Sequence, residues 1–207
     1  MADELSKQII PVGTYAANCI VLWQGADALV VDPGQDAADI LAFLKERHLA
    51  PKAVLLTHGH FDHVGGVPGL LAAFPGLAVY AHPADWPMLD HPMNRNPPDY
   101  PGIARPSTLL DIRAASDLPA ALRFEALETP GHTPGSVCLR FGGLLLSGDT
   151  LFAGSCGRTD FPGGSMAEMR KSLAALAKLP PDLEVVPGHG PSTTIGREVA
   201  ENPFMER

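Results

Sequence analysis

No stretch of this 207-residue chain approaches the roughly 18 consecutive apolar residues that a membrane-spanning helix needs. The opening residues, MADELSKQIIPVG, carry acidic side chains and lack the apolar core of a secretory signal peptide. The 15 lysines and arginines form no cluster, and the formal net charge is −8. We therefore expect a cytoplasmic protein that binds a small molecule, with no nucleic acid and no membrane among its partners. Nothing in the sequence predicts an oligomeric state.

Cysteine is also scarce, since the chain has only Cys19, Cys138 and Cys156. An odd number of widely spaced cysteines without a CxxC pair fits reduced thiols better than a disulfide framework. An apolar fraction of 45% argues against disorder, while 21 glycines and 21 prolines indicate many turns rather than long helices. The length suits one large α/β domain, so we expect residues 1–207 to form a single domain.

The apolar patterns predict a mixed α/β fold with sheets inside and helices outside. We expect strands over residues 7–12, 18–24, 28–32, 53–57, 77–81, 122–127, 136–141, 144–147 and 184–186. We expect helices over residues 36–50, 69–74 and 166–179, with Pro51 ending the first of them. The continuously apolar segment 53–57 is typical of a strand buried on both faces. The proline-rich residues 82–106 predict a short helix followed by a long surface loop, in which Arg95 and Tyr100 are candidates to line a pocket.

Three of the eight histidines lie in the segment THGHFDH, directly after the predicted strand 53–57. Histidine is the commonest side-chain metal ligand, and carboxylate oxygens join it around zinc and similar ions. In a tight turn, with Gly59 giving the backbone freedom, His58, His60 and His63 can converge on one small volume. Asp62 adds a charged oxygen. The segment therefore predicts part of a metal site.

Further ligands must come from other strand-end turns, where His132 in ETPGHTPGS, Asp149 in LLLSGDTLF and His189 in VVPGHGP each stand beside a glycine. Seven ligands suit two metal ions. The first ion would take His58, His60 and His132, the second would take Asp62, His63 and His189, and Asp149 would bridge them. Each ion would keep an open position for water, as catalytic sites do, with Asp62 and Asp149 orienting that water. A metal-binding protein without catalysis and purely structural histidines are the alternatives.

Residues 57–63, together with Asp32 in VVDPG, His132, Asp149 and His189, resemble the metal motifs of the metallo-β-lactamase superfamily. This resemblance spans most of the chain. It implies a four-layer αβ/βα sandwich in which two mixed β-sheets are flanked by helices. It also implies that Asp32 supports the histidine loop without binding the metals, although a plain turn aspartate before Pro33-Gly34 fits the sequence as well.

Residues 148–164, GDTLFAGSCGRTDFPGG, resemble a segment of hydroxyacylglutathione hydrolases (glyoxalase II), and the tail 187–204 resembles their short bacterial type. The likeness implies that Arg158 binds the glutathione part of the substrate; pairing of Arg158 with Asp160 is the alternative. Long glyoxalase II enzymes carry an extra C-terminal helical region, which we do not expect in this chain. This chain also has Gly190-Pro191 where they carry a tyrosine soon after the last ligand histidine.

The resemblance implies hydrolysis of S-D-lactoylglutathione, or of a related acylglutathione, by hydroxide formed at two divalent metal ions. We expect zinc, with iron or manganese as alternatives. Persulfide dioxygenases also resemble this sequence, and they use a single iron held at the positions of His58, His132 and Asp149. A lactonase or another hydrolase of this fold, and a non-catalytic metal binder, are further alternatives.

Overall fold

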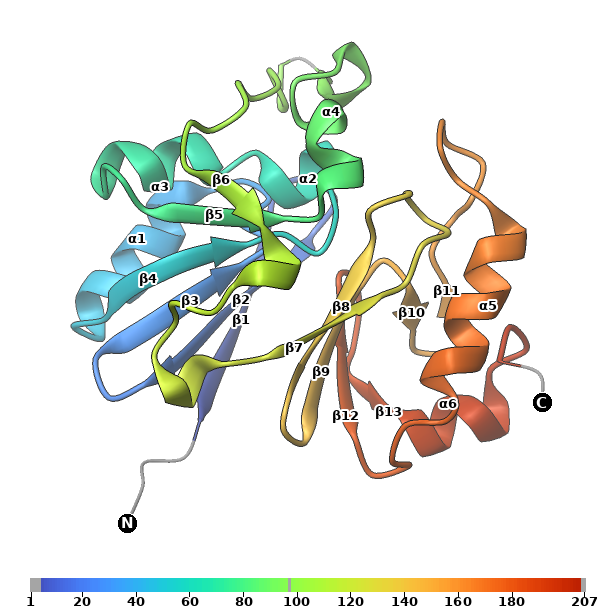
Figure 1. Cartoon of the computed structure of the whole chain (residues 1–207). Helices are drawn as coiled ribbons and strands as arrows, with labels where there is room; N and C mark the ends of the chain where they lie inside the picture. Colours follow the sequence, from blue (N-terminus) through green and yellow to red (C-terminus); the bar gives the residue numbers. More distant parts are fainter. Residues whose placement is uncertain (1–4, 97, 206–207) are drawn as a thin grey trace. The chain divides into compact units, whose positions relative to one another are not determined.

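The computed structural model describes residues 5–96 and 98–205, and it contains two mixed β-sheets, each with helices packed against it (Figure 1). The chain divides into two units, residues 1–123 and 124–207, with one of these sheets in each. We call them the N-terminal and the C-terminal unit. The α/β class with two mixed sheets flanked by helices is confirmed, whereas a single domain over residues 1–207 stays a prediction.

The N-terminal sheet has six strands in chain order. They are β1 (Ser6–Val12), β2 (Ala17–Gln24), β3 (Asp27–Val31), β4 (Ala50–Leu55), β5 (Ala78–Ala81) and β6 (Leu109–Asp111). The first three pair antiparallel and the last four pair parallel. Because parallel strands end at the same edge of a sheet, the segments that follow β3 and β4 begin side by side. Asp32 and the histidine segment occupy these two positions.

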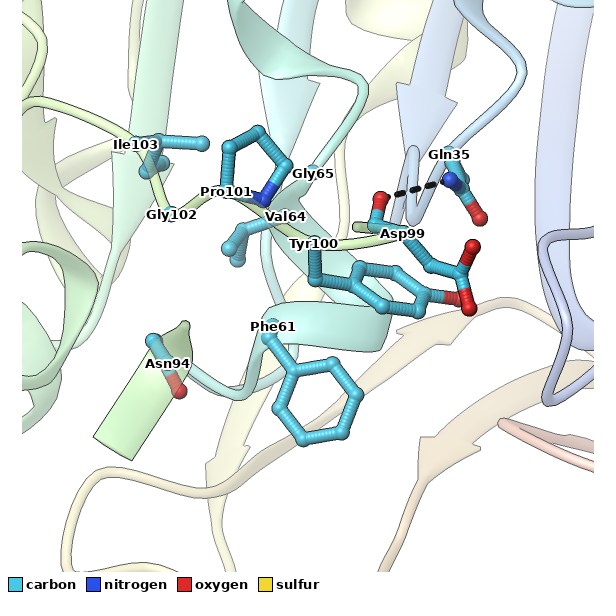
Figure 2. Close-up of a pocket in the computed structure, with 10 residues that line it drawn as sticks. All are labelled: Gln35, Phe61, Val64, Gly65, Asn94, Asp99, Tyr100, Pro101, Gly102 and Ile103. Carbon is cyan, nitrogen blue, oxygen red and sulfur yellow. Dashed lines mark hydrogen bonds between the residues drawn. The ribbon is translucent and has the colours of Figure 1, made fainter. Parts of the chain in front are cut away.

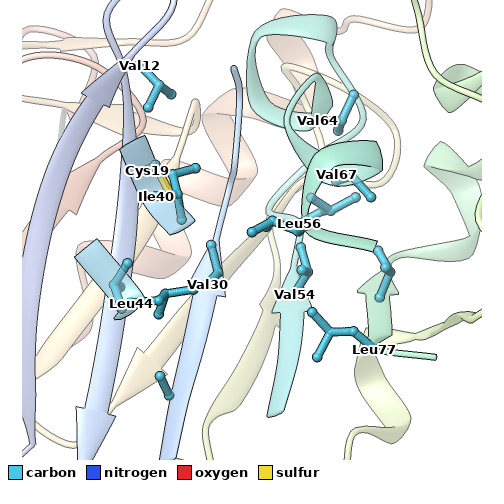
Figure 3. Packing of buried hydrophobic residues seen from close by; sticks show 14 of the residues in the cluster. Val12, Cys19, Val30, Ile40, Leu44, Val54, Leu56, Val64, Val67 and Leu77 are labelled. Atoms are coloured by element: carbon cyan, nitrogen blue, oxygen red, sulfur yellow. The ribbon is translucent and has the colours of Figure 1, made fainter. Parts of the chain in front are cut away.

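Helices pack against the N-terminal sheet and share one apolar core with it. They are α1 (Ala37–Glu46), α2 (Phe61–Val64), α3 (Val67–Ala73) and α4 (Trp86–Leu89), with 3₁₀ turns at Pro83–Asp85, Pro92–Asn94, Ile112–Ala114 and Ala120–Leu122. Ile40 and Leu44 of α1 belong to the same buried cluster as Val30 and Val54 of the sheet (Figure 3). As predicted, β4 is buried on both faces from Ala53 onward, which gives the histidine segment a fixed base.

Two predictions for this unit are wrong. Pro51 does not end the first helix, which stops at Glu46; it lies inside β4, where a register irregularity in the pairing with β3 tolerates a residue without an N–H. The short helix predicted after residue 82 is present as α4, but the segment that follows it is not simply a surface loop, because Asn94 and Tyr100 are buried. Strand β6 was not predicted.

The C-terminal sheet runs in the order β13-β12-β9-β8-β7, with β9 and β12 parallel and the other pairs antiparallel. Its strands are β7 (Glu125–Glu128), β8 (Val137–Phe141), β9 (Leu144–Gly148), β12 (Glu184–Pro187) and β13 (Thr193–Thr194). Strands β10 (Leu151–Phe152) and β11 (Ser155–Cys156) form a small separate hairpin. Met169 and Leu173 of α5 (Met166–Leu176) pack with Leu145 and Val185 of the sheet.

Most of the predicted C-terminal elements are confirmed with shifted ends. Strand β7 begins at Glu125 rather than at residue 122, because Leu122 lies in a 3₁₀ turn, and α5 ends three residues before residue 179. Strands β10, β11 and β13 and helix α6 (Ile195–Glu201) were not predicted. None of the helices in the described part of the chain has the length and apolar character that crossing a bilayer requires.

Candidate metal centre

The three histidines of THGHFDH lie close together where β4 ends and α2 begins. His58, His60 and His63 are all buried, with the ring of His58 centred 5.0 Å from that of His60 and 4.2 Å from that of His63. Nε2 of His63 is 3.9 Å from Oδ2 of Asp62 in the same turn of helix. Imidazole nitrogens and a carboxylate oxygen at such spacing are suitable ligands for divalent ions. The predicted convergence of these side chains is thus present within the N-terminal unit.

Asp32, which follows β3, is fully buried beneath this cluster. Its Oδ1 accepts the backbone N–H of Thr57 at 2.8 Å, and its Oδ2 accepts the Thr57 hydroxyl at 2.6 Å. The same Oδ2 lies 3.0 Å from Nδ1 of His63. A carboxylate at Nδ1 holds the ring so that Nε2 can act as the ligand atom, which is the usual contact behind a metal-binding histidine. These contacts support the predicted role of Asp32 as a residue that steadies the ligands.

In the C-terminal unit, His132, Asp149 and His189 also lie together. Asp149 directly follows β9 and His189 follows the parallel strand β12, so both leave the same edge of the sheet. Oδ2 of Asp149 is 3.5 Å from Nε2 of His132 and 3.7 Å from Nε2 of His189. One carboxylate between two imidazole nitrogens is the arrangement expected of a bridging ligand between two metal ions. Nδ1 of His132 donates to the backbone oxygen of Arg158 at 2.8 Å, which leaves Nε2 as its ligand atom.

Two glycines allow the backbone to approach the candidate aspartate ligands. A Cβ on Gly34 would collide with the backbone oxygen of Asp62, and a Cβ on Gly157 would collide with that of Asp149. Any larger residue at either position would push the aspartate-bearing segment away. The local sequence does not predict these close approaches, because Gly34 fits a turn after Asp32 and Gly157 lies eight residues after Asp149.

Arg158 makes the alternative contact that the sequence suggested. Its Nε and Nη2 donate to the two carboxylate oxygens of Asp160 at 2.7 and 2.8 Å, and its guanidinium lies 3.9 Å from the centre of the Phe161 ring. The Arg158 guanidinium lowers the pKa of Asp160 to about 2. Both side chains are more than half exposed, at 55% and 68%. Arg158 therefore lies at the surface with its guanidinium paired to Asp160, and Nη1 takes no part in that pair.

The cysteines offer no activated nucleophile. Burial raises the pKa of the Cys19 and Cys156 thiols, and it raises that of Cys138 to about 11. A reactive cysteine needs the opposite shift, because the thiolate is the attacking species. None of the three thiols has the lowered pKa that marks an activated nucleophile.

A pocket lies beside α2 in the N-terminal unit, with a volume of about 280 Å³ that includes space open to solvent (Figure 2). Its walls include Phe61, Asn94 and Tyr100, and the rings of Phe61 and Tyr100 are 4.8 Å apart between centres. Gln35 Nε2 donates to the backbone oxygen of Asp99 at 2.7 Å across one side. Tyr100, a candidate pocket residue in the sequence, is thus a buried part of the wall.

The family model described as the metallo-beta-lactamase superfamily matches residues 12–189. A relative from Haemophilus influenzae, named hydroxyacylglutathione hydrolase GloC, is 33% identical over 210 residues and covers 97% of this chain and 98% of its own.

Solved structures of similar proteins cover nearly the whole chain. The B3 metallo-beta-lactamase BLEG-1 is 35% identical, with a TM-score of 0.87 over 97% of this chain and 99% of that one. TTHA1623, solved in a di-iron-bound form, is also 35% identical, with a TM-score of 0.81 over 95% of this chain and 99% of that one. ETHE1 from Myxococcus xanthus is 25% identical, with a TM-score of 0.75 over 96% of this chain and 83% of that one.

Proposed function

This chain belongs to the metallo-beta-lactamase superfamily, and from that premise we propose that it is a hydrolase that cleaves the thioester of S-D-lactoylglutathione or of a related acylglutathione. The observation that carries the proposal is the position of Asp149, whose Oδ2 lies within 4 Å of Nε2 of both His132 and His189. This contact pattern favours two metal ions over one. The 33% identity to the protein named hydroxyacylglutathione hydrolase GloC supports the substrate class.

The residues fit two divalent ions because they offer neutral imidazoles and carboxylates, the donors that zinc and iron accept. The proposed ligands are His58, His60, Asp62, His63, His132, Asp149 and His189. We expect zinc, and the likeness to a protein solved with two irons keeps iron as the main alternative. Bound ions of this kind lower the pKa of a coordinated water toward ~7 and stabilise negative charge on an attacked carbonyl oxygen.

The chain's own residues would orient the reactants. The carboxylates of Asp62 and Asp149 can accept protons of a water in hydrogen bonds and so aim its lone pair at the thioester carbonyl. Arg158, held by Asp160 and Phe161, has Nη1 outside that pair as a donor for a carboxylate of the glutathione part. A thiol of pKa about 8.5 leaves readily as thiolate, so no separate general acid is needed.

The test measures three activities of the purified protein and determines the number and identity of its metal ions per chain. Lactoylglutathione hydrolysis with two ions per chain is the expected result. Oxygen uptake with glutathione persulfide, one iron per chain and no thioester cleavage would instead indicate the dioxygenase. Nitrocefin serves as the third substrate, because a B3 metallo-beta-lactamase is 35% identical to this chain.

A matched pair of variants ties the activity to the site. Asp149→Asn should abolish hydrolysis, whereas Asp27→Asn, at an exposed carboxylate paired with Lys52 at 2.9 Å, should leave it unchanged. If thioester cleavage survived Asp149→Asn in full, the proposed centre would be wrong.

A further inference from the structure

The peptide groups of Gly59, the residue between His58 and His60, are held by two side chains from outside the histidine motif. The N–H of Gly59 donates to Oδ2 of Asp85 at 2.9 Å. The carbonyl oxygen of Gly59 accepts from Nδ2 of Asn94 at 2.6 Å. The two residues are 26 and 35 positions further along the chain, in the 3₁₀ turns that precede and follow α4. One residue is thus fixed at both of its ends.

These contacts are buried and leave little room for movement. Asp85 is 0% exposed and Asn94 is 1% exposed. Nδ2 of Asn94 also donates to the backbone oxygen of Met88 at 2.8 Å, so the side-chain amide of Asn94 contacts both α4 and Gly59. A Cβ on Gly59 would lie 3.1 Å from the Asp85 backbone oxygen and 3.3 Å from Cβ of Met88. The segment 83–94 therefore packs directly on the backbone of the histidine loop.

Metal binding is sensitive to this kind of restraint. A rotation of either peptide group of Gly59 would swing the Cα of His58 or His60, and the displacement would grow along the side chain to the ring nitrogen. Metal–ligand distances tolerate only about 0.2 Å of error, so a loose loop must be ordered again each time an ion binds. A loop that is already fixed does not bear that loss of conformational entropy on binding.

We propose that Asp85 and Asn94 are positioning residues that set the metal affinity of the centre by fixing Gly59. The proposal rests on the metal ligands of the proposed function, though not on its substrate. Neither residue touches substrate or metal in this scheme. A purely structural role would make the same contacts, but it would change the stability of the fold without changing the affinity of the folded protein for metal.

The experiment separates these two roles with cobalt(II), whose visible spectrum reports ligand geometry. Metal-free wild type, Asn94→Leu and Asp85→Ala are titrated with cobalt in competition with a chelator, below the unfolding temperature of each. We expect affinity at least about tenfold weaker in both variants, as for other residues that orient metal ligands, together with an altered cobalt spectrum. Asp85→Asn keeps an acceptor for the Gly59 N–H and should stay within about threefold of wild type.

Leu44→Ala is the matched control. Leu44 is a buried core residue of α1 in the same unit, and it does not belong to the histidine loop. The Leu44→Ala change should lower the unfolding temperature while leaving cobalt affinity and spectrum as in wild type. Wild-type affinity in folded Asn94→Leu or folded Asp85→Ala would overturn the proposal. If Asn94→Leu does not fold, the comparison of cobalt affinity between Asp85→Ala and Asp85→Asn still separates the positioning role from the purely structural one. Cobalt binding by a wild type that hydrolyses no thioester would refute the proposed substrate and leave this inference standing.

Discussion

Replacing Asp32 by asparagine should impair the histidine cluster while keeping the shape of the side chain. The backbone N–H of Thr57 requires an acceptor, so the amide oxygen would take the place of Oδ1. The amide NH₂ would then stand where Oδ2 now lies, 2.6 Å from the Thr57 hydroxyl oxygen and 3.0 Å from Nδ1 of His63. An N–H donor at Nδ1 favours the tautomer with its proton on Nε2, and a protonated nitrogen cannot bind a metal.

The effect should extend to a second ligand. The Thr57 hydroxyl oxygen is 3.1 Å from Nδ1 of His58 and can accept from that ring while its own hydrogen points to Asp32; without that acceptor, the hydrogen can turn toward Nδ1 instead. Loss of one partner of a ligand histidine typically weakens metal binding about 10- to 100-fold, or roughly 1.4 to 2.7 kcal/mol. One buried donor without its acceptor should also lower the free energy of unfolding by about 1–3 kcal/mol.

Chelator competition for zinc and ¹⁵N NMR of the imidazole rings in the metal-free protein measure both consequences. We expect weaker zinc binding and a His63 ring that has moved its proton from Nδ1 to Nε2. Asp27→Asn, the exposed control, should show neither change. Wild-type zinc affinity in Asp32→Asn, or an unchanged His63 tautomer, would refute this reasoning.

Other expected outcomes follow from single contacts. Asp149→Ala should release both ions, because its Oδ2 lies near both His132 and His189, and metal analysis after dialysis checks this. Arg158→Ala should raise KM for the acylglutathione by about tenfold with little change in kcat, and an unchanged KM would exclude Arg158 from substrate binding. The carboxyl of Asp160 should titrate at a pKa of about 2, since pairing favours its charged form, and NMR should find a higher value in Arg158→Ala. The Cys138 thiol, buried with a pKa of about 11, should resist alkylation at pH 8 until the protein unfolds.

The local pattern of the sequence was sufficient to predict where most strands end, and with them the positions of the candidate ligands. His58 follows the buried second half of β4, and Asp149 follows the fully buried β9, as their neighbouring apolar residues indicated. The prediction failed where tertiary contacts decide. Pro51 ends helices in isolation, yet here it occupies an irregular point of β4. The strands that were missed, β6, β10, β11 and β13, have only two or three residues each, which is too few to show a period.

The supporting residues were harder to predict than the candidate ligands. Asp85 and Asn94 lie in a proline-rich segment that resembles a solvent-exposed loop, and their role depends on a backbone contact with Gly59 that no local pattern encodes. Asp32 was suggested only by family resemblance, because an aspartate before Pro33 is also an ordinary turn residue. Polar residues gain such roles from the packing of distant segments.

Zinc titration of the metal-free protein, with the rate of lactoylglutathione hydrolysis as readout, tests the two-ion thioester hydrolase most directly. We predict that the rate rises until two equivalents of zinc per chain have been added and then stays constant. A plateau at one equivalent would contradict the two-ion centre. The absence of thioester cleavage at any zinc, iron or manganese loading would contradict the proposed reaction.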